Sequence, residues 1–141
     1  MIGLLVITHG RIAEELVAAA REIVGALEGI EPLCVGWDED VGAVARRVEQ
    51  AIARVDRGRG VLILTDMFGG TPTNLALSHL ERGRVEIVTG VNLPMLIKYT
   101  SLREEPELIQ VAATIAEQGR QSIQVASQLL DAHEPGSDRA E

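Results

Sequence analysis

The fold is decided by a stretch near the N-terminus, IGLLVITHGRIAEELVAAAREIVGAL, at residues 2–27. Residues 2–8 are a short run rich in Ile, Leu and Val, which predicts a buried β-strand. Over residues 11–27 the apolar positions change to helical spacing, and they fall at Ile12, Leu16, Ala19, Ala20, Ile23 and Leu27. The sequence therefore predicts a strand followed directly by a helix.

The same alternation repeats along the chain. Residues 31–35 predict a second strand and residues 41–55 a second helix. A third strand is expected at 60–65, then a Gly-Gly-Thr-Pro turn and a helix to about residue 80, and a fourth strand at 85–88. Short buried strands that alternate with amphipathic helices are typical of a parallel sheet covered on both faces. We therefore expect an α/β fold with an open, doubly wound parallel sheet of four strands.

The last third of the sequence is less regular. Residues 94–99 and 107–117 have helical spacing, and Gly119 predicts the end of the later helix. Residues 122–126 predict either a fifth, edge strand or a helix that continues through positions 129 and 130. We expect residues 1–133 to form one domain and the polar residues 134–141 to form a disordered tail.

Charge and composition argue against several classes of function. The 141 residues carry a formal net charge of −8, so nucleic-acid binding is not expected. No apolar run approaches the ~20 residues that cross a bilayer, and direct membrane insertion is not expected either. The N-terminus has no basic leader, and Cys34 is the single cysteine. These features predict a cytoplasmic protein.

Two polar side chains are expected at the carboxyl edge of the sheet, where ligands of open α/β folds bind. His9 follows the first strand, and Gly10 leaves its imidazole open to approach. Asp66 follows the third strand, and a carboxylate on one ring nitrogen would raise the basicity of the other. The free nitrogen would then be a nucleophile. The alternatives are a packed or capping His9 and an Asp66 that only caps a helix or turn.

The turn that follows predicts a phosphate site. Gly69 and Gly70 permit close approach of the backbone, and Thr71 offers a hydroxyl and is the expected N-cap before Pro72. Free N–H groups at a helix start favour a phosphate, although an ordinary strand-to-helix turn has the same composition. The sequence contains neither a metal-ligand cluster nor a P-loop or dinucleotide motif, so no metal and no cofactor is expected.

Three motifs together resemble the enzyme IIA domains of the mannose-type phosphotransferase system. They are VITHG at residues 6–10, TDMFGGTPTN at 65–74 and GVNLPML at 90–96. The resemblance implies a phosphohistidine at His9, formed from the carrier protein phospho-HPr and discharged to a IIB component. It also implies that Asp66 orients the ring, that Gly69, Gly70 and Thr71 border the phosphoryl group, and that the protein is a homodimer exchanging residues 122–126 as a strand.

Apolar residues near His9 are expected to dock HPr. Phe68 is the first candidate and Trp37 the second. The acidic residues 38–40 would attract a basic partner, unless they form only a solvated loop. His79 and His133 lie away from the predicted site and are expected to face solvent.

Other protein classes also place a His-Gly after the first strand. Histidine phosphatases have an Arg where this chain has Thr8. Small tetrapyrrole metal chelatases, with His9 as a metal ligand, are the main alternative, but they would not explain residues 66–74. A regulator sensed through its phosphorylated state and a dihydroxyacetone kinase subunit of the same fold are further readings, and the Gly-Gly-Thr-Pro-Thr-Asn segment suits the mannose type better than the latter.

Overall fold

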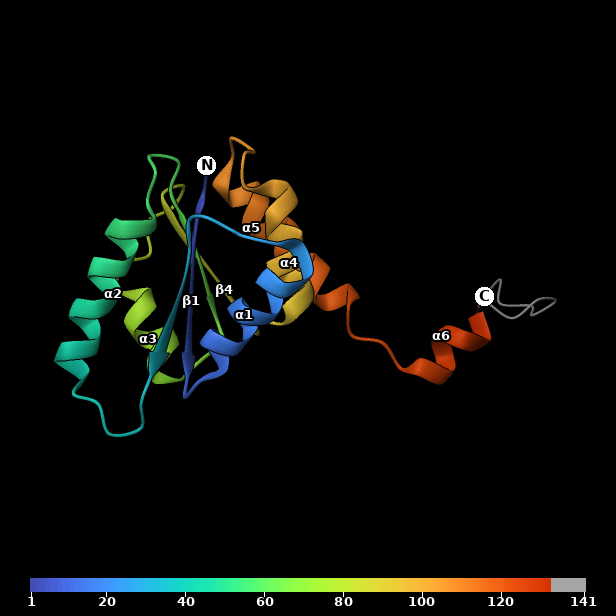
Figure 1. Ribbon diagram of the computed structural model, residues 1–141, viewed down its shortest axis with the longest axis horizontal. Helices are drawn as coiled ribbons and strands as arrows, with labels where there is room; N and C mark the ends of the chain where they lie inside the picture. The colour runs from blue at the N-terminus through green and yellow to red at the C-terminus, as the bar shows by residue number, and fades with distance from the viewer. Residues whose placement is uncertain (133–141) are drawn as a thin grey trace.

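The computed structural model describes residues 1–132, which form four strands and six helices (Figure 1). The strands are β1 (Gly3–His9), β2 (Ile30–Val35), β3 (Val61–Thr65) and β4 (Val85–Thr89). The helices are α1 (Ile12–Val24), α2 (Val41–Val55), α3 (Thr71–Leu77), α4 (Leu93–Leu102), α5 (Leu108–Gln121) and α6 (Ala126–Ala132). The tail predicted at residues 134–141 and His133 lie outside the described residues.

The four strands form one parallel sheet in the order β2-β1-β3-β4. Leu4 of the central strand β1 pairs with Ile30 of β2 and, on its other side, with Leu62 of β3. Pro32 lies in β2, an edge strand, where the missing N–H of proline is tolerated. The predicted α/β class and the open, doubly wound four-stranded sheet are confirmed.

Helices cover both faces of the sheet, because successive side chains of a strand point to opposite sides. Leu4 and Val6 of β1 belong to a buried cluster with residues of α1, α4 and α5, whereas Leu5 and Ile7 belong to a second cluster with residues of α2. Figure 1 shows α2 and α3 on one side of the sheet and α1, α4 and α5 on the other. Each buried Leu or Ile contributes about 1.5–3 kcal/mol to folding.

The amino end of the sheet is closely packed. A Cβ on Gly3 would lie 2.2 Å from the carbonyl oxygen of Val55, the last residue of α2, so only glycine lets this helix approach β1. The fully buried Tyr99 of α4 donates its hydroxyl hydrogen to the carbonyl oxygen of Ile2. Burial raises the pKa of Tyr99 to about 12. The N–H of Ile2 in turn donates to the carbonyl oxygen of Arg103 at 2.7 Å.

Several helix ends differ from the prediction. Helix α1 ends at Val24 and not at residue 27, and α4 continues to Leu102, beyond the predicted residue 99. Helix α3 ends at Leu77, before the predicted position 80. Helix α5 continues to Gln121, so the prediction that Gly119 ends a helix is wrong. Gly119 is buried inside α5, and a Cβ there would lie 2.6 Å from the sulfur of Met95 in α4. The absence of a side chain at Gly119 therefore allows α5 to pack closely against α4.

The C-terminal segment differs from the body of the protein. Residues 122–125 form no strand in this single chain, and α6 follows them as a separate helix with no buried residue. Residues 122–125 therefore form neither the predicted edge strand nor a continuation of α5, and positions 129 and 130 belong to the separate helix α6. Figure 1 shows this segment leading away from the rest of the molecule. No helix within residues 1–132 is both long and apolar enough to cross a membrane.

Candidate active site

His9 and Asp66 meet at the carboxyl edge of the sheet, as the sequence predicts. One carboxylate oxygen, Oδ2 of Asp66, lies 2.8 Å from Nδ1 of the His9 ring and accepts the backbone N–H of His9 at 3.0 Å. The other oxygen, Oδ1, accepts the N–H of Met67 at 3.0 Å. The side chains are 21% and 14% exposed, respectively. Asp66 therefore fixes the His9 ring relative to its own backbone and leaves Nε2 without this partner.

The strand register brings the two residues together across 57 positions of sequence. Ile7 of β1 pairs with Thr65 of β3, so the residues that follow each strand emerge side by side. The loop after β3 is held by two threonines that sequence reasoning missed. The hydroxyl of Thr73 donates to the carbonyl oxygen of Met67 at 2.6 Å and lies 2.7 Å from the hydroxyl of Thr65. The presence of a threonine on each side of this strand-to-helix loop is the sequence signal that could have predicted these hydrogen bonds.

Gly70 gives the His9 ring its space. A Cβ at this position would lie 2.6 Å from Cε1 and 3.0 Å from Nε2 of His9. Gly10 adopts a φ of 55°, in the left-handed region that favours glycine, and a Cβ there would meet no atom within 4 Å. The Nε2 edge of the ring thus faces a backbone that carries no side chain.

Trp37 covers the flat side of the imidazole. Its ring is stacked on that of His9, with centroids 5.4 Å apart and an angle of 24° between the planes. The indole is otherwise exposed, with 80% of its surface open to solvent. The sequence placed Trp37 near the site as a docking residue but gave no indication of the stack, because neither hydrophobic periodicity nor spacing encodes which way a loop side chain turns.

The acidic loop at residues 38–40 is engaged within itself. Glu39 accepts the N–H of Gly36 and pairs with Arg47 at 2.6 Å, and Asp40 caps α2 by accepting the N–H of Ala43 at 3.0 Å. The hydrogen bond from Gly36 lowers the pKa of Glu39, and Arg47 adds to this effect. Two of the three acids therefore stabilise the loop, which supports the interpretation of a solvated loop; attraction of a basic partner stays a prediction.

The remaining predicted residues surround the pair. Gly69 and Thr71 are exposed beside Gly70, and Phe68 is 71% exposed at the end of β3. The prediction that Thr71 caps α3 is wrong, because Gly70 is the N-cap and Thr71 begins the helix. His79 lies beyond the end of α3 and is half-buried, not solvent-facing as expected.

The electrostatics of Asp66 favour its charged form. Partial burial acts to raise the pKa of Asp66, but the hydrogen bonds from the ring and backbone of His9 outweigh it, and the pKa is lowered from its ordinary value. An ionised Asp66 accepts a hydrogen bond from the Nδ1–H group of His9. This hydrogen bond favours the tautomer in which Nε2 carries the lone pair. The arrangement can therefore present a nitrogen nucleophile. In residues 1–132, no group of three or more His, Cys, Asp or Glu is placed to hold a metal ion.

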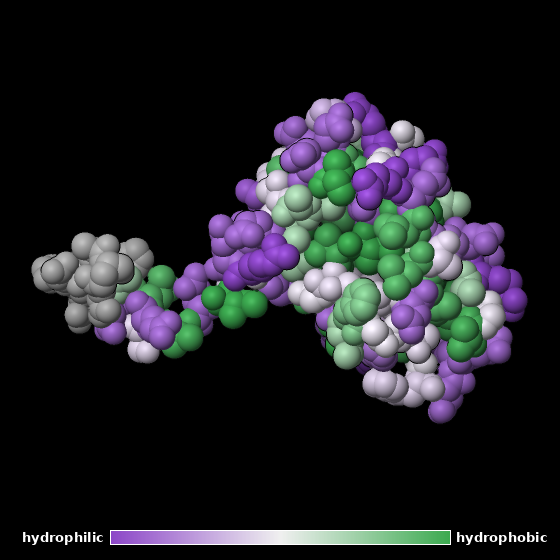
Figure 2. Space-filling view, turned by 180° about the vertical axis from the view of Figure 1, so that it is seen from behind, coloured by the Kyte–Doolittle hydropathy of each residue, from purple (hydrophilic) through white to green (hydrophobic). Residues whose placement is uncertain are grey.

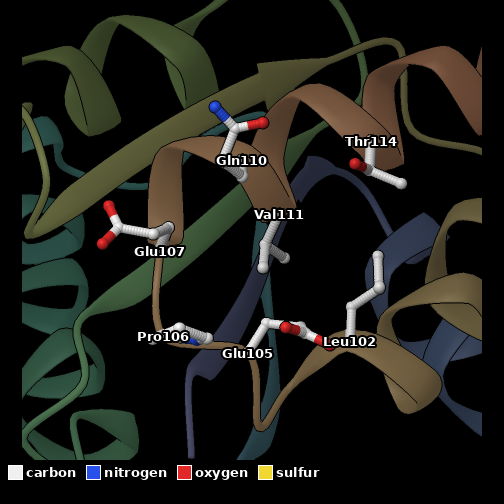
Figure 3. A pocket seen from close by; sticks show the side chains of 7 residues that line it. All are labelled: Leu102, Glu105, Pro106, Glu107, Gln110, Val111 and Thr114. Atoms are coloured by element: carbon white, nitrogen blue, oxygen red, sulfur yellow. The ribbon is translucent and has the colours of Figure 1, made fainter.

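A hollow elsewhere in the molecule is unrelated to this pair. It has a volume of about 240 Å³ and lies between the end of α4 and the first turns of α5 (Figure 3). The residues that line it include the apolar Leu102 and Val111 and the acidic Glu105 and Glu107. None of the residues that line it belongs to the predicted site.

Comparison with known proteins agrees with this geometry. The family model described as "PTS system fructose IIA component" matches residues 3–116, which include both His9 and Asp66. The chain belongs to this family. The assignment does not support the chelatase alternative, and it confirms the resemblance to phosphotransferase IIA domains.

Individual relatives extend the match over most of the chain. The fructose-specific EIIA component of Bacillus subtilis is 31% identical over 132 residues, which cover 93% of this chain and 90% of that protein. The mannose-specific EIIAB component of Escherichia coli K12 is 30% identical over 129 residues, 86% of this chain but only 38% of that longer protein. The solved structure of a PTS IIA protein associated with the fucose utilization operon of Streptococcus pneumoniae has a TM-score of 0.81 at 28% identity, covering 91% of this chain and 95% of that one.

Proposed function

We propose that this IIA-family chain is a cytoplasmic phosphocarrier that accepts a phosphoryl group on Nε2 of His9 from phospho-HPr and passes it to a IIB component. The observation that carries the proposal is that Asp66 forms two hydrogen bonds with His9, one to the ring and one to the backbone. Its Oδ2 atom lies 2.8 Å from Nδ1 and 3.0 Å from the backbone nitrogen of the same residue. The ring is thus oriented with one nitrogen engaged and the other available.

The transfer step needs only the groups at this site. The lone pair of Nε2 attacks phosphorus of the donor phosphohistidine, a new N–P bond forms, and the donor's N–P bond breaks with its electron pair returning to the donor ring. The Nδ1 proton stays in its hydrogen bond to Asp66, whose negative charge balances the positive charge that develops on the imidazole. Discharge to the IIB component runs the same step in reverse.

The phosphoryl group on Nε2 would lie against Gly70. We propose that Gly10, Gly69, Gly70 and Thr71 form its rim, because a Cβ on Gly70 would occupy the space beside Nε2. The exposed Phe68 is the proposed apolar docking point for the carrier, beside the neighbouring Met67, which is also exposed. Aromatic residues are enriched in protein interfaces, which favours this choice.

The proposed active form is a homodimer. Strand β4 is an edge strand, and Ile123 and Val125 are 77% and 57% exposed. Figure 2 shows the face opposite that of Figure 1, where apolar residues gather in the middle and polar ones surround them. An exposed edge strand and an apolar patch both favour pairing with another chain. We propose that residues 122–126 of a second copy add to β4, and that residues 1–133 form one IIA domain.

Intact-mass spectrometry tests the phosphocarrier. The protein is incubated with phosphoenolpyruvate, enzyme I and HPr, and we expect one added phosphoryl group that is lost in acid. His9→Ala should take up none while keeping its circular dichroism spectrum, and His79→Ala should be labelled like the native protein. Stoichiometric labelling of His9→Ala would refute the assignment.

A further inference from the structure

The loop that carries Trp37 is built to hold the indole in place. The loop follows β2, and Gly10 donates its N–H to the carbonyl oxygen of Val35 at 2.9 Å, which ties the end of β2 to the end of β1. Glu39 accepts the N–H of Gly36, and its second oxygen is bound by Arg47 at 2.6 Å. Arg47 also reaches the carbonyl oxygen of Cys34 at 3.4 Å. The residue between these ties is therefore fixed although its side chain is exposed.

The His9 ring is bounded on three sides by residues of two loops, one after β3 and one after β2. Asp66 engages its Nδ1 edge, Gly70 lies against its Cε1–Nε2 edge, and the indole of Trp37 covers one face. The hydrogen bond to Asp66 alone permits the ring to tilt about the Nδ1–Oδ2 direction. A stacked aromatic ring opposes that tilt, since offset stacks have a preferred plane and separation.

Resting on the proposed phosphocarrier function, we propose that Trp37 is a positioning residue for phosphoryl transfer, which aligns Nε2 and shields one face of phosphohistidine 9 from water. Hydrolysis of the phosphohistidine requires a water oxygen to attack phosphorus while the N–P bond breaks and its electron pair returns to Nε2, and the protons of the water leave with the inorganic phosphate. An indole against the ring removes one side from which water approaches the N–P bond. Trp37 therefore acts on both the transfer rate and the lifetime of the phosphorylated state.

Three variants test this role. Trp37→Ala removes the stack, and Trp37→Phe keeps an aromatic ring. Phe68→Ala removes another exposed aromatic residue, which is not stacked on His9. We measure the maximal phosphorylation rate at saturating phospho-HPr, the donor concentration at half that rate, and the half-life of the isolated phosphorylated protein. A stack of this kind corresponds to a change of about 2- to 10-fold in rate. Trp37→Ala should lower the maximal rate and the half-life by that factor, and Trp37→Phe should restore most of both.

The Phe68→Ala control separates alignment from docking. It should raise the half-saturating donor concentration and leave the half-life of the phosphorylated protein unchanged. If Trp37→Ala behaves in the same way, with an unchanged half-life and maximal rate, then Trp37 only docks the donor and the proposal is wrong. A Trp37→Ala protein indistinguishable from the native one in all three measurements also overturns it.

A fluorescence measurement tests the stack of Trp37 on His9 independently of phosphoryl transfer. Trp37 is the only tryptophan of the chain, so indole emission reports on it alone. His9→Ala should change the intensity of that emission, whereas His79→Ala should not. If native protein takes up no phosphoryl group at all, the phosphocarrier function fails, and a His9-dependent emission would show that the stack exists without that role. Emission insensitive to His9→Ala overturns the stacking on which the inference depends.

Discussion

The two ends of the sheet differ in how closely the chain packs around certain glycines and polar groups. At the amino end, Gly3 lies against the backbone of α2, and the hydroxyl of a fully buried tyrosine is bound to Ile2. At the carboxyl end, Gly10 and Gly69 have open space where a side chain would stand, and His9 and Asp66 are partly exposed. The amino end is densely packed. At the carboxyl end, hydrogen bonds between side chains and loops fix residues that remain partly exposed. Stability and chemistry are therefore expected to respond to substitutions at different ends.

Gly3→Ala should have the largest effect at the amino end. Its Cβ would lie 2.2 Å from a backbone oxygen of Val55, which cannot move without shifting α2. Overpacking of this kind costs about 3 kcal/mol of the free energy of unfolding. Urea unfolding measures it, and Gly42→Ala, near the start of α2 where a Cβ would meet side-chain atoms at 3.3 Å or more, is the matched control. The contrast between the two ends is broken if Gly3→Ala unfolds at the native urea midpoint.

Asp66→Asn should have the largest effect on transfer among variants that keep His9. The amide no longer fixes the ring in the productive tautomer, and loss of such an orienting partner lowers activity by about 10- to 100-fold. Quenched-flow labelling with phospho-HPr measures it. A native labelling rate would show that the ring is oriented by other groups.

The same variant predicts a pH effect. The pKa of Asp66 is lowered in the folded protein, so its contribution to stability is present above the ordinary carboxyl pKa of 3.8 and is lost as the pH falls through the lowered value. Acid titration of the unfolding midpoint should therefore be shallower for Asp66→Asn than for the native protein. Identical acid profiles would contradict the coupling of Asp66 to His9.

Adjacent glycines at the carboxyl end should respond differently to the same substitution. Gly70→Ala places a methyl group 2.6 Å from Cε1 of His9, so the ring must turn and the transfer rate should fall about 10-fold. Gly69→Ala meets no atom, but its φ of 93° strains an alanine by about 1 kcal/mol. Labelling rates and urea midpoints measured together separate these effects. Equal labelling rates for both variants would mean that the His9 ring has room to spare.

Tyr99→Phe should have the smallest effect. Loss of the hydrogen bond to Ile2 costs about 1 kcal/mol of stability at neutral pH. The pKa of Tyr99 is about 12 in the folded protein against 10.0 for an ordinary tyrosine. Between these two pH values the hydroxyl keeps its proton in the folded state and loses it in the unfolded state. Native stability should fall over this range as the pH rises, and Tyr99→Phe should lack that part of the fall. Thermal midpoints of both proteins from pH 9 to 12 provide the measurement, and parallel curves would contradict the buried hydroxyl.

The sequence predicts well those features that depend on the local spacing of apolar residues and on which strands are neighbours in the sheet. The change from an apolar run to helical spacing at Gly10 is a local signal, and it places β1, α1 and His9 to within a few residues. The proximity of Asp66 follows because β1 and β3 are parallel neighbours, and their carboxyl ends must share an edge. Neither inference needs the direction of any side chain.

Features that depend on contacts between distant side chains were not predictable in this way. Gly119 resembles a helix end, yet it is a contact point for Met95, since local sequence does not distinguish a glycine that ends a helix from one that packs against another. The stack of Trp37 on His9 depends on ties within the loop after β2, above all those of Glu39. Residues 122–125 alternate like a strand, but within residues 1–132 they pair with no strand.

The bond between His9 and Asp66 spans 57 residues, and it links strands that are separated in sequence by an entire strand-helix unit. During synthesis, the histidine leaves the ribosome long before the carboxylate that orients it, and loop closure over this distance must precede the contact. A partly folded chain therefore carries His9 without a competent site. Under the proposed function, phosphorylation of His9 would therefore report that the central sheet has formed, because an unfinished molecule lacks the carboxylate that orients the ring.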